Sequence, residues 1–351
     1  MKALTVDRHA DDLSCVTLSE MEKPALHTGQ VLVRMRASAI NPSDFNVIHG
    51  RYEQALRRAV WNYDKPTTYL LPRGQPLRRA PCTLGSEGVG VVEAAGSGFF
   101  ARRLLGRRVA VVADLPESGT WAEYLAVDAG RALPLPKDID DAQGAMFFIN
   151  PMTTYILTRE VLRVPRGGYL LQTAGGSALG RMVIRLGRRY GFRTISIVRR
   201  VERAAELRRL GGDAVIATDS EDPFTRVAEI TGGEGVHSAI DSVGGQLGSE
   251  VLRCLAPRGR LVCYGALSQQ NTVLPVREMM MSLAHVEGFY LGNWLASQPR
   301  WKLLSILRNV KKLVGTGELG ASAERQFSLS DYETAFAYAR SGAGKALFRM
   351  N

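Results

Sequence analysis

A regular alternation between residues 168 and 266 limits the fold of this chain more than any other feature of its sequence. Short apolar runs are followed by amphipathic stretches, and most of these stretches end in glycine. Strands that alternate with helices of about 10 to 15 residues pair in parallel through right-handed crossovers. The pattern predicts an α/β fold with a doubly wound parallel sheet, which binds ligands at the carboxyl ends of its strands. The apolar runs lie at residues 168–174, 194–198, 213–218, 236–245 and 258–266.

A glycine-rich turn lies between the first apolar run and the first helix. It reads Gly175-x-Ser177-x-x-Gly180, with serine in place of the middle glycine of the dinucleotide-binding fingerprint. The first glycine allows a tight turn, and the last allows the helix to pack closely on the strand. Because the turn stands between a strand and a helix, we expect the backbone N–H groups of residues 176–180 to bind a pyrophosphate.

Two arginines follow the second apolar run, where an acid ordinarily binds a ribose hydroxyl of the cofactor. Arg199 comes after Gly175 at roughly the interval expected for that acid, about 20 residues. A guanidinium group forms charge-assisted, forked hydrogen bonds with phosphate oxygens. The sequence therefore predicts NADP(H), with its ribose phosphate, rather than NAD(H). The alternative is that Arg199 and Arg200 are surface charges after a strand.

The rest of the chain predicts a second domain. Before residue 150, short strand-like segments are separated by glycine and proline turns, which is typical of a compact, mostly β domain. The segment after residue 310 returns to short mixed elements, and we expect it to pack on the N-terminal part. The predicted domains are residues 1–149 with 310–351, and residues 150–309, with the substrate in the cleft between them.

Bulk composition excludes several classes of protein. No apolar run of about 18 residues is present, so no membrane span and no membrane partner are expected. The N-terminus lacks the pattern of a signal or transit peptide, and a cytoplasmic protein is the default. The 4 cysteines form no close pair, so neither a disulfide framework nor a zinc cluster is predicted. The net charge of +11 attracts anions such as nucleotides, coenzyme A or an acidic carrier protein, although much of it can be solvated surface charge.

Several segments spread over nearly the whole chain form a recognisable set. They are NPSD (41–44), HGRY (49–52), INPMTTY (149–155), GGSALG (175–180), VRR (198–200), SVGG (242–245), YGALSQQ (264–270) and GFYLGNW (288–294). Together they resemble the zinc-independent, quinone oxidoreductase-like branch of the medium-chain dehydrogenase/reductase superfamily. Within it they are most similar to the mitochondrial-type 2-enoyl thioester reductases. The resemblance implies a GroES-like, mostly β catalytic domain, a Rossmann NADP(H)-binding domain, a role in fatty acid or polyketide metabolism and a homodimer paired through residues 284–294.

The resemblance also implies roles for individual residues. Tyr52 corresponds to the catalytic tyrosine of the family, and Asn41 lies beside it in the catalytic set. A phenol suits proton donation because its ordinary pKa is about 10, although Tyr52 can also orient substrate or only line the cleft. Trp294 corresponds to an acyl-pocket residue. The implied cofactor-binding residues are Asn150, Gly175, Gly176, Ser177, Ala178, Leu179, Gly180, Arg199, Arg200, Tyr264, Gly265, Ala266, Leu267, Phe289, Tyr290, Leu291 and Lys345.

The zinc-dependent relatives hold their metal with a cysteine and a Gly-His-Glu motif. In this chain Asn41 and Ser86 stand at the corresponding places, so no metal site is expected. Carbonyl reduction needs a strong Lewis acid, and zinc supplies it. The resemblance therefore favours reduction of a conjugated C=C bond, with hydride added to the β-carbon, negative charge on the thioester oxygen and a proton delivered to the α-carbon.

The resemblance breaks between Tyr52 and Gly85, where this sequence carries extra residues. The insertion is rich in aromatic and basic side chains and begins beside the proposed acid. It can bind the phosphates of coenzyme A or an acidic carrier, or it can reshape the pocket for an unusual substrate. Tyr63, within it, is a rival proton donor and a candidate substrate-binding residue.

Three functions remain open. The first is an NADPH-dependent reductase of enoyl thioesters carried on coenzyme A or acyl carrier protein. The second is a quinone or enone reductase of the same superfamily. The third is a catalytically inactive NADPH-binding protein that uses its basic surface to bind a partner or, less expected, nucleic acid, in which case binding should weaken with salt.

Overall fold

The computed structural model describes residues 1–52, 55, 82–113 and 118–350, and these divide into two compact units. Unit 1 comprises residues 1–149 and 321–351, and unit 2 comprises residues 150–320. The sequence analysis set the second boundary at residue 310. The structure sets it at residue 320, because a long helix, α12 (Arg300–Gly315), belongs to unit 2. No helix in the described ranges is long and apolar enough to cross a bilayer.

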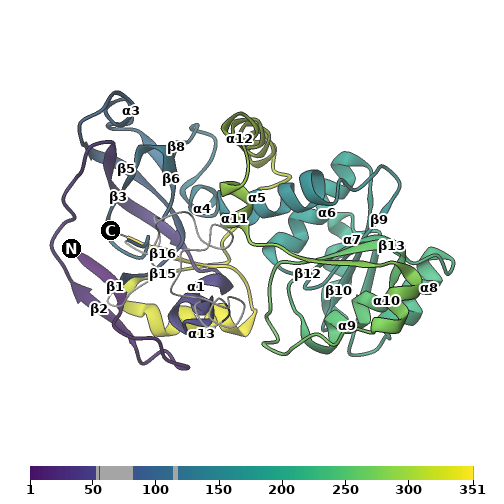
Figure 1. Cartoon of the computed structure of the whole chain (residues 1–351). Coiled ribbons are helices and arrows are strands. Elements are labelled where there is room, and N and C mark those ends of the chain that lie inside the picture. The colour runs from purple at the N-terminus through teal and green to yellow at the C-terminus, as the bar shows by residue number, and fades with distance from the viewer. Residues whose placement is uncertain (53–54, 56–81, 114–117, 351) are drawn as a thin grey trace. The chain divides into compact units, whose positions relative to one another are not determined.

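Unit 1 is mostly β structure, as the sequence predicts. A three-stranded sheet has the order β2-β1-β4, and a larger sheet has the order β15-β16-β3-β5-β6-β8, with β7 paired to β3 (Figure 1). The strands are β1 (Lys2–Val6), β2 (Val16–Glu20), β3 (Gln30–Ala39), β4 (Cys82–Thr83), β5 (Glu87–Ala95), β6 (Arg108–Val112), β7 (Tyr124–Asp128), β8 (Ala132–Pro134), β15 (Arg325–Ser328) and β16 (Ala346–Arg349). The helices are α1 (Pro42–Ile48), α3 (Phe99–Arg102), α4 (Asp141–Ala145) and α13 (Tyr332–Ser341), with 3-10 turns at Ala129–Arg131 and Leu329–Asp331.

The core of unit 1 contains side chains from both the N-terminal and the C-terminal segments of this unit. Trp121 is fully buried, and its ring centroid lies 5.2 Å from those of Phe336 and Phe348. The indole N–H donates to the carbonyl oxygen of Ala39 at 2.9 Å, so the polar atom of this large apolar side chain is satisfied. Strand β16 also pairs antiparallel with β3, with Phe348 opposite Ser38. The C-terminal segment therefore packs on the N-terminal domain, as predicted.

Unit 2 contains one parallel sheet with the order β11-β10-β9-β12-β13-β14 (Figure 1). This is the strand order of the doubly wound dinucleotide-binding fold, with the reversal between β9 and β12. Strand β14 forms one edge of the sheet. The strands are β9 (Tyr169–Gln172), β10 (Arg193–Val198), β11 (Ala214–Ala217), β12 (Val236–Asp241), β13 (Leu255–Cys263) and β14 (His285–Gly288). The helices besides α12 are α5 (Ile149–Tyr155), which continues as a π-helical turn (Ile156–Val161), α6 (Ala178–Tyr190), α7 (Glu202–Leu210), α8 (Pro223–Thr231), α9 (Gly245–Arg253), α10 (Val276–Ser282) and α11 (Leu291–Ala296).

The crossover helices of unit 2 begin and end where their sequences predict. Helix α6 buries Met182, Val183, Ile184 and Leu186 and ends at Gly191, whose φ of 78° is the left-handed conformation that favours glycine. Helix α8 starts with Pro223 after Asp222, whose carboxylate accepts the N–H of Thr225 at 2.8 Å. These signals fix the lengths of the crossovers, so the carboxyl ends of all the strands reach one edge of the sheet.

Candidate functional site

The turn after β9 brings the first two strands of unit 2 very close to α6. The N–H of Gly175 donates to the carbonyl oxygen of Ile197 at 2.9 Å. A Cβ atom added to Gly175 would lie 2.6 Å from the Cβ of Ser196, and one added to Gly180 would lie 2.5 Å from the carbonyl oxygen of Gly175. Real Cβ atoms essentially never come so close to other heavy atoms. Glycine is therefore required at both positions by close approach of the backbone.

Ser177 caps α6, and its hydrogen bonds decide which N–H groups of the turn stay open to a ligand. Its hydroxyl accepts the N–H of Gly180 at 3.0 Å, and its own N–H donates to the carbonyl oxygen of Ala174 at 2.9 Å. The sequence analysis assigned every N–H of residues 176–180 to the phosphates, but those of Ser177 and Gly180 are used inside the turn. The N–H groups of Gly176, Ala178 and Leu179 have no acceptor in the described part of the chain, and a helix N-terminus with open N–H groups attracts anions.

Arg199 and Arg200 follow β10 at the same edge of the sheet. Both side chains are exposed. Within the described ranges no carboxylate lies at ion-pair distance from either guanidinium group. The exposed position leaves both guanidinium groups able to bind an external anion. Their geometry is compatible with the phosphate-binding role that the sequence predicts, and also with that of ordinary surface charges.

A buried carboxylate, to which the sequence assigned no role, ties the end of β9 to the end of β12. Asp241 accepts the hydroxyl of Thr173 at 2.6 Å and the N–H groups of Val243 and Gly244 at 2.8 and 2.9 Å. Tyr264 follows the last residue of β13, and its N–H donates to the backbone carbonyl oxygen of Asp241 at 2.8 Å. The available signal was the aspartate at the end of the apolar run VHSAID.

Tyr264 and Gly265 directly follow β13, and the backbone is closely packed there. Burial raises the pKa of Tyr264 to about 12, so its hydroxyl keeps its proton at neutral pH. A Cβ added to Gly265 would lie 2.9 Å from the carbonyl oxygen of Ser242, so the ends of β12 and β13 touch there. Ala266 and Leu267 follow as exposed residues, and the N–H of Leu267 donates to the carbonyl oxygen of Ser242 at 3.0 Å.

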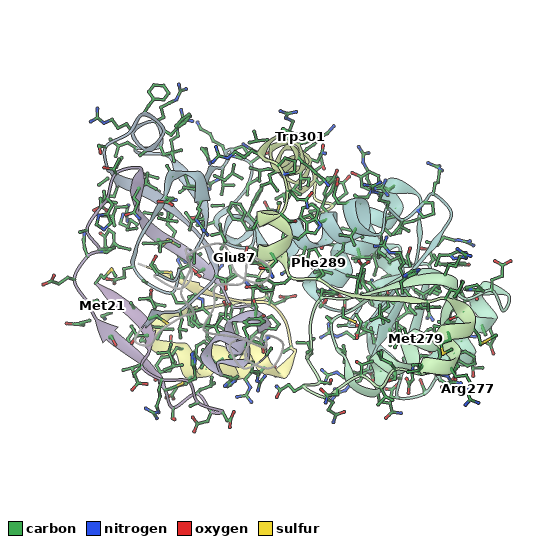
Figure 2. The ribbon with its side chains drawn as sticks, in the orientation of Figure 1. Met21, Glu87, Arg277, Met279, Phe289 and Trp301 are labelled. Carbon is green, nitrogen blue, oxygen red and sulfur yellow. The ribbon has the colours of Figure 1, made fainter. Side chains whose placement is uncertain are left out.

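Unit 1 contains a buried chain of polar groups. The ammonium group of Lys345 donates to the carbonyl oxygen of Ile40 at 2.8 Å and to Oδ1 of Asn41. The side-chain amide of Asn41 donates to Oε1 of Glu87 at 3.0 Å. Oε2 of Glu87, which is labelled in Figure 2, accepts the N–H groups of Phe148 and Ile149, each at 2.9 Å. The ammonium group of Lys345, the side-chain amide of Asn41 and the carboxylate of Glu87 thus form one hydrogen-bonded chain. Both oxygens of the carboxylate accept hydrogen bonds.

A second branch of this cluster starts from the same asparagine. The backbone N–H of Asn41 donates to Oδ2 of Asp44 at 2.8 Å, and the hydroxyl of Ser86 donates to Oδ1. Asp44 and Glu87 are both buried. We refer to Asn41, Asp44, Ser86, Glu87 and Lys345 as the buried polar cluster. Of these, the sequence predicted functional roles for Asn41 and Lys345 and missed both carboxylates.

The buried polar cluster has the electrostatics of a desolvated ion pair. Burial raises the pKa of Glu87, and the charge of Lys345 opposes that shift. Burial lowers the pKa of Lys345, and the charges of Glu87 and Asp44 oppose that shift. Two hydrogen bonds leave one N–H of the ammonium group of Lys345 without an acceptor among the described residues. That N–H can serve a bound molecule.

The donor set of the cluster does not fit a catalytic zinc ion. Zinc takes thiolate, imidazole or carboxylate ligands in tetrahedral geometry. Here the asparagine oxygen accepts the lysine ammonium, and the serine hydroxyl donates to Asp44. No group of three histidine, cysteine or acidic side chains able to hold a metal is found in the described ranges.

Tyr52 lies in unit 1 close to the end of a described range. Its hydroxyl accepts the side-chain amide of Asn46 at 3.3 Å, so the phenolic proton does not serve this bond. The aromatic and basic insertion that follows, including Tyr63, lies outside the described residues except at its ends. The roles predicted for Tyr63 and for the insertion therefore stay predictions.

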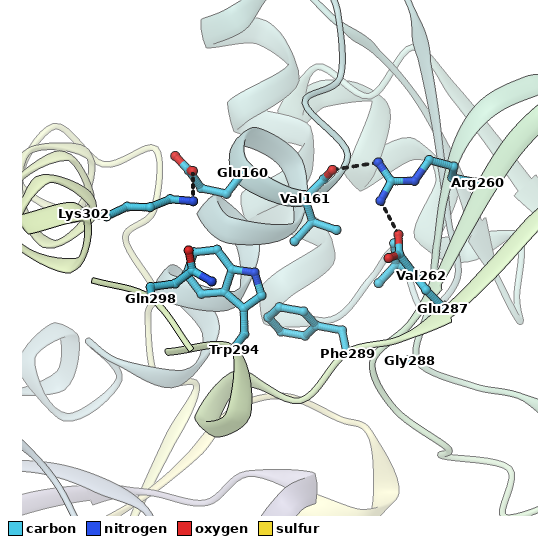
Figure 3. Close-up of a pocket in the computed structure, with 10 residues that line it drawn as sticks. All are labelled: Glu160, Val161, Arg260, Val262, Glu287, Gly288, Phe289, Trp294, Gln298 and Lys302. Carbon is cyan, nitrogen blue, oxygen red and sulfur yellow. Dashed lines mark hydrogen bonds and ion pairs between the residues drawn. The ribbon is translucent and has the colours of Figure 1, made fainter. Parts of the chain in front are cut away.

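A cavity of about 280 Å³ lies within unit 2, beside the segment after β14 (Figure 3). Phe289 and Trp294 line it together, although the resemblance implied a cofactor role for one and an acyl role for the other. Glu160 pairs with Lys302 at 3.2 Å in its wall. A second ion pair, between Arg260 and Glu287, lies across from it. The cavity is thus amphipathic, with aromatic faces and paired charges.

The other predicted residues fall as follows. Asn150 begins unit 2, and its carbonyl oxygen accepts the hydroxyl of Thr154 at 2.7 Å. Tyr290 and Leu291 start α11, where Tyr290 is exposed. The structure thus brings Asn41 and Lys345 together in unit 1, with Tyr52 in the same unit. It brings the turn residues, the arginines and the segments after β13 and β14 to unit 2.

Two family models match the chain. A model described as alcohol dehydrogenase GroES-like domain matches residues 27–137, and one described as zinc-binding dehydrogenase matches residues 178–307. A curated relative, the mitochondrial enoyl-acyl-carrier-protein reductase of Bos taurus, is 28% identical over 336 residues, which cover 95% of this chain and 83% of the relative.

Solved structures share the fold. A putative NADPH:quinone reductase from Bacillus thuringiensis has a TM-score of 0.86 and 29% identity, and the match covers 100% of this chain and 99% of that one. The quinone oxidoreductase of Escherichia coli, solved in complex with NADPH, has a TM-score of 0.85 and 22% identity, with 100% of each chain covered. The second likeness supports the fold alone.

Proposed function

The chain belongs to the medium-chain dehydrogenase/reductase superfamily of nicotinamide-dependent oxidoreductases, and from this premise we propose that it reduces the C=C bond of a 2-enoyl thioester with NADPH. The thioester is carried on coenzyme A or on an acyl carrier protein. Two findings support the proposal: the likeness to a mitochondrial enoyl-acyl-carrier-protein reductase over 95% of the chain, and the composition of the buried polar cluster.

The buried polar cluster is the observation that carries the assignment of a C=C bond. The positions at which zinc-dependent relatives hold their metal are occupied by an amide and a hydroxyl that already bond to Lys345 and Asp44. These side chains offer no Lewis acid for a carbonyl oxygen. Reduction of an alkene conjugated with a thioester needs only hydrogen-bond donors for the negative charge that develops on the thioester oxygen.

The cofactor is NADP(H). The N–H groups of Gly176, Ala178 and Leu179 would hold the pyrophosphate, and Arg199 and Arg200 would hold the ribose phosphate. Tyr264 to Leu267, Phe289 to Leu291, Asn150 and Lys345 would contact the nicotinamide half. Bound NADPH supplies the hydride that is added to the β-carbon.

The proton for the α-carbon comes from Tyr52. Asn46 donates to the Tyr52 oxygen at 3.3 Å, and a phenol with an ordinary pKa of about 10 carries the proton that a substrate carbanion needs. Trp294 and Phe289 offer aromatic faces to the acyl part, and the open N–H of Lys345 is a candidate donor to the thioester oxygen or the cofactor. Tyr63 remains the rival proton donor.

A quinone or enone reductase is the second candidate, supported by the 29% identity to a putative NADPH:quinone reductase structure. The two candidates are separated by steady-state oxidation of NADPH and of NADH with crotonyl-CoA, an enoyl-acyl carrier protein and a benzoquinone. We expect the highest kcat/KM with an enoyl thioester and NADPH. A higher value with the quinone would establish the second candidate, and tight NADPH binding without turnover would indicate an inactive NADPH-binding protein.

Tyr52→Phe tests the proton donor. We expect kcat with the enoyl thioester to fall about a hundredfold or more, while the Kd of NADPH is unchanged. Tyr332→Phe is the matched control in unit 1, because it removes another phenolic hydroxyl, one that donates a long bond of 3.5 Å to the carbonyl oxygen of Val16. Wild-type turnover in Tyr52→Phe would remove this role from Tyr52.

We also propose that the chain forms a homodimer through the edge strand β14. This strand is at the end of the sheet, and no residue of the adjacent α10 is buried. Met280 is 68% exposed and Met281 is 83% exposed, and Met279 lies on the same helix (Figure 2). An open strand edge beside exposed apolar side chains favours pairing with a second copy. Sedimentation of wild-type and Met280→Glu/Met281→Glu chains tests it: the wild type should be dimeric and the variant monomeric.

A further inference from the structure

The helical turn α3 lies at one end of unit 1 (Figure 1). It carries two aromatic side chains that are exposed to solvent. Phe99 is 67% exposed and Phe100 is 78% exposed, and their ring centroids lie 5.7 Å apart. Leu105, a few residues later, is also exposed. Soluble domains rarely place adjacent phenylalanines so fully in water, because burying such rings is strongly favourable.

The turn is held firmly by the residues between these side chains. Ala101 and Leu104 are buried in the core of unit 1. The backbone that follows the turn bonds to β5: the N–H of Gly106 donates to the carbonyl oxygen of Val92, and the N–H of Val92 donates to the carbonyl oxygen of Arg107. The exposure of Phe99 and Phe100 is therefore built into an anchored turn.

The same turn carries an uncompensated positive charge. Arg102, Arg103 and Arg107 are exposed, and no aspartate or glutamate occurs between residues 94 and 113. No described carboxylate lies within ion-pair distance of these three guanidinium groups. The guanidinium carbon of Arg103 lies 5.4 Å from the ring centroid of Phe99, so charge and aromatic surface adjoin. We name Phe99, Phe100, Arg102, Arg103, Leu105 and Arg107 the α3 tip.

We propose that the α3 tip binds an anionic lipid surface. Two phenyl rings offer at most about 400 Å², whereas a stable protein interface buries about 800 Å² on each partner. Binding to a lipid surface does not require a continuous buried area of this size. Single apolar side chains enter the boundary of the acyl chains while arginines bind the lipid phosphates. The sequence analysis excluded a membrane partner on the absence of an apolar span, and a compact surface tip leaves no such signal.

The position of the α3 tip separates this binding from the proposed chemistry. Strand β5 begins at Glu87, in the buried polar cluster, and α3 follows its other end. Eight residues of extended chain span about 26 Å, so a surface bound at the tip is remote from Asn41 and Lys345. The inference therefore stands apart from the proposed function and does not depend on it.

Co-sedimentation of the full chain with vesicles tests the proposal. We expect binding to vesicles that contain phosphatidylglycerol, little binding to phosphatidylcholine alone, and weaker binding at high salt. Phe99→Ala/Phe100→Ala should abolish binding. Arg102→Ala/Arg103→Ala should weaken it about fivefold per arginine, because each basic residue near the surface contributes about 1 kcal/mol. Arg208→Ala/Arg209→Ala on α7, with the same change in charge at exposed positions, should bind like wild type.

A second measurement locates the contact. Phe100→Trp should show fluorescence that is quenched by brominated lipid in the anionic vesicles, beyond any quenching of the wild-type chain. If the double phenylalanine variant melts earlier than wild type, the arginine pair and the tryptophan reporter carry the test. The proposal is wrong if anionic vesicles bind no chain, if the phenylalanine variant binds as well as wild type, or if the α3 tip variants change the oligomeric state instead, which would make the tip a protein interface.

Discussion

The turn after β9 and the buried polar cluster of unit 1 both present polar groups, but they are made from different parts of the chain. The turn uses backbone N–H groups and glycines from one short segment, residues 175–180. The cluster uses side chains from residues 41–44, 86–87 and 345, which only the folded sheet brings together. A site made of backbone depends on shape, whereas a site made of buried side chains depends on every partner being present. Single substitutions should therefore affect the two sites in different ways.

The largest effect is expected from Glu87→Ala. The substitution leaves one buried and two partly buried donors without an acceptor, and Lys345 loses one of the two buried carboxylates that oppose its charge. Removing one partner of a buried ion pair costs about 3–5 kcal/mol, so unit 1 should lose that much stability. Hydrogen exchange of β3 and β5, compared with that of β9 and β10, measures the loss in each unit separately.

Glu93→Ala is the control on the same strand. Its carboxylate pairs at the surface with Lys23 at 3.3 Å and Arg34 at 3.5 Å, and exposed pairs contribute about 1 kcal/mol or less. Equal losses in Glu87→Ala and Glu93→Ala would mean that the buried polar cluster does not stabilise unit 1.

Arg199→Ala probes the unit 2 edge, where the effect should fall on the ligand and not on the fold. Loss of a charge-assisted hydrogen bond to phosphate should raise the Kd of NADPH about tenfold to a hundredfold and leave that of NADH unchanged. The melting temperature should stay at the wild-type value, because Arg199 is exposed. Fluorescence titration with both cofactors measures this, with Arg209→Ala as the control. Parallel losses for NADPH and NADH would contradict phosphate recognition by Arg199.

Alkaline pH should lower the free energy of unfolding of unit 2, because this unit buries the uncharged thiols of Cys254 and Cys263. Burial raises the pKa of Cys254 to about 12 and that of Cys263 to about 11. A folded-state pKa above the unfolded one gives stability that is complete below the unfolded pKa and is lost as pH rises toward the folded pKa. Above about pH 9, unit 2 should lose about 1.4 kcal/mol per pH unit for each thiol, up to the folded pKa. Urea unfolding from pH 8 to 10.5, followed by exchange in each unit, measures it.

The corresponding control is Cys254→Ala/Cys263→Ala, which should remove this dependence between about pH 9 and 10, below the range in which Tyr264 contributes. A variant that loses stability with pH as steeply as wild type would assign the effect to other groups. Lys345 works in the opposite direction, because burial lowers its pKa and its contribution is lost as pH falls.

The smallest effect is expected from Ser177→Ala. The variant removes the acceptor of the Gly180 N–H and should cost about 1 kcal/mol, the usual contribution of an N-cap. Ser177→Thr keeps the hydroxyl and should retain most of that stability. Thermal melting compares the three chains, and a Ser177→Ala chain that melts with wild type would show that the cap contributes nothing.

The sequence predicted the turn after β9 better than the buried polar cluster. The turn depends on neighbouring residues, whereas the cluster depends on contacts between residues far apart in the chain. The turn and its helix follow from local rules: glycine spacing, amphipathic period and a glycine stop at Gly191. All five apolar runs became strands of the parallel sheet, and the mostly β unit 1 was also predicted correctly. The carboxylates Asp44, Glu87 and Asp241 were missed, because a lone acid in a sequence looks like a surface charge until its partners are known.

The sequence also could not show which N–H groups of the turn bond inside the turn and which stay open. The fingerprint assigns the whole turn to phosphate, but a serine in the middle position can bond to its own helix. The boundary at residue 320 was likewise missed, because the apolar face of α12 does not reveal which unit it packs against.

The cap formed by Ser177 has a consequence for coenzyme engineering. Since the N–H groups of Ser177 and Gly180 already bond inside the turn, its shape is set before any nucleotide binds, and ordering it incurs little entropy loss on binding. Exchange of Arg199 and Arg200 for an acid and a neutral residue should then redirect preference between the two nicotinamide coenzymes without rebuilding the loop that receives their shared diphosphate.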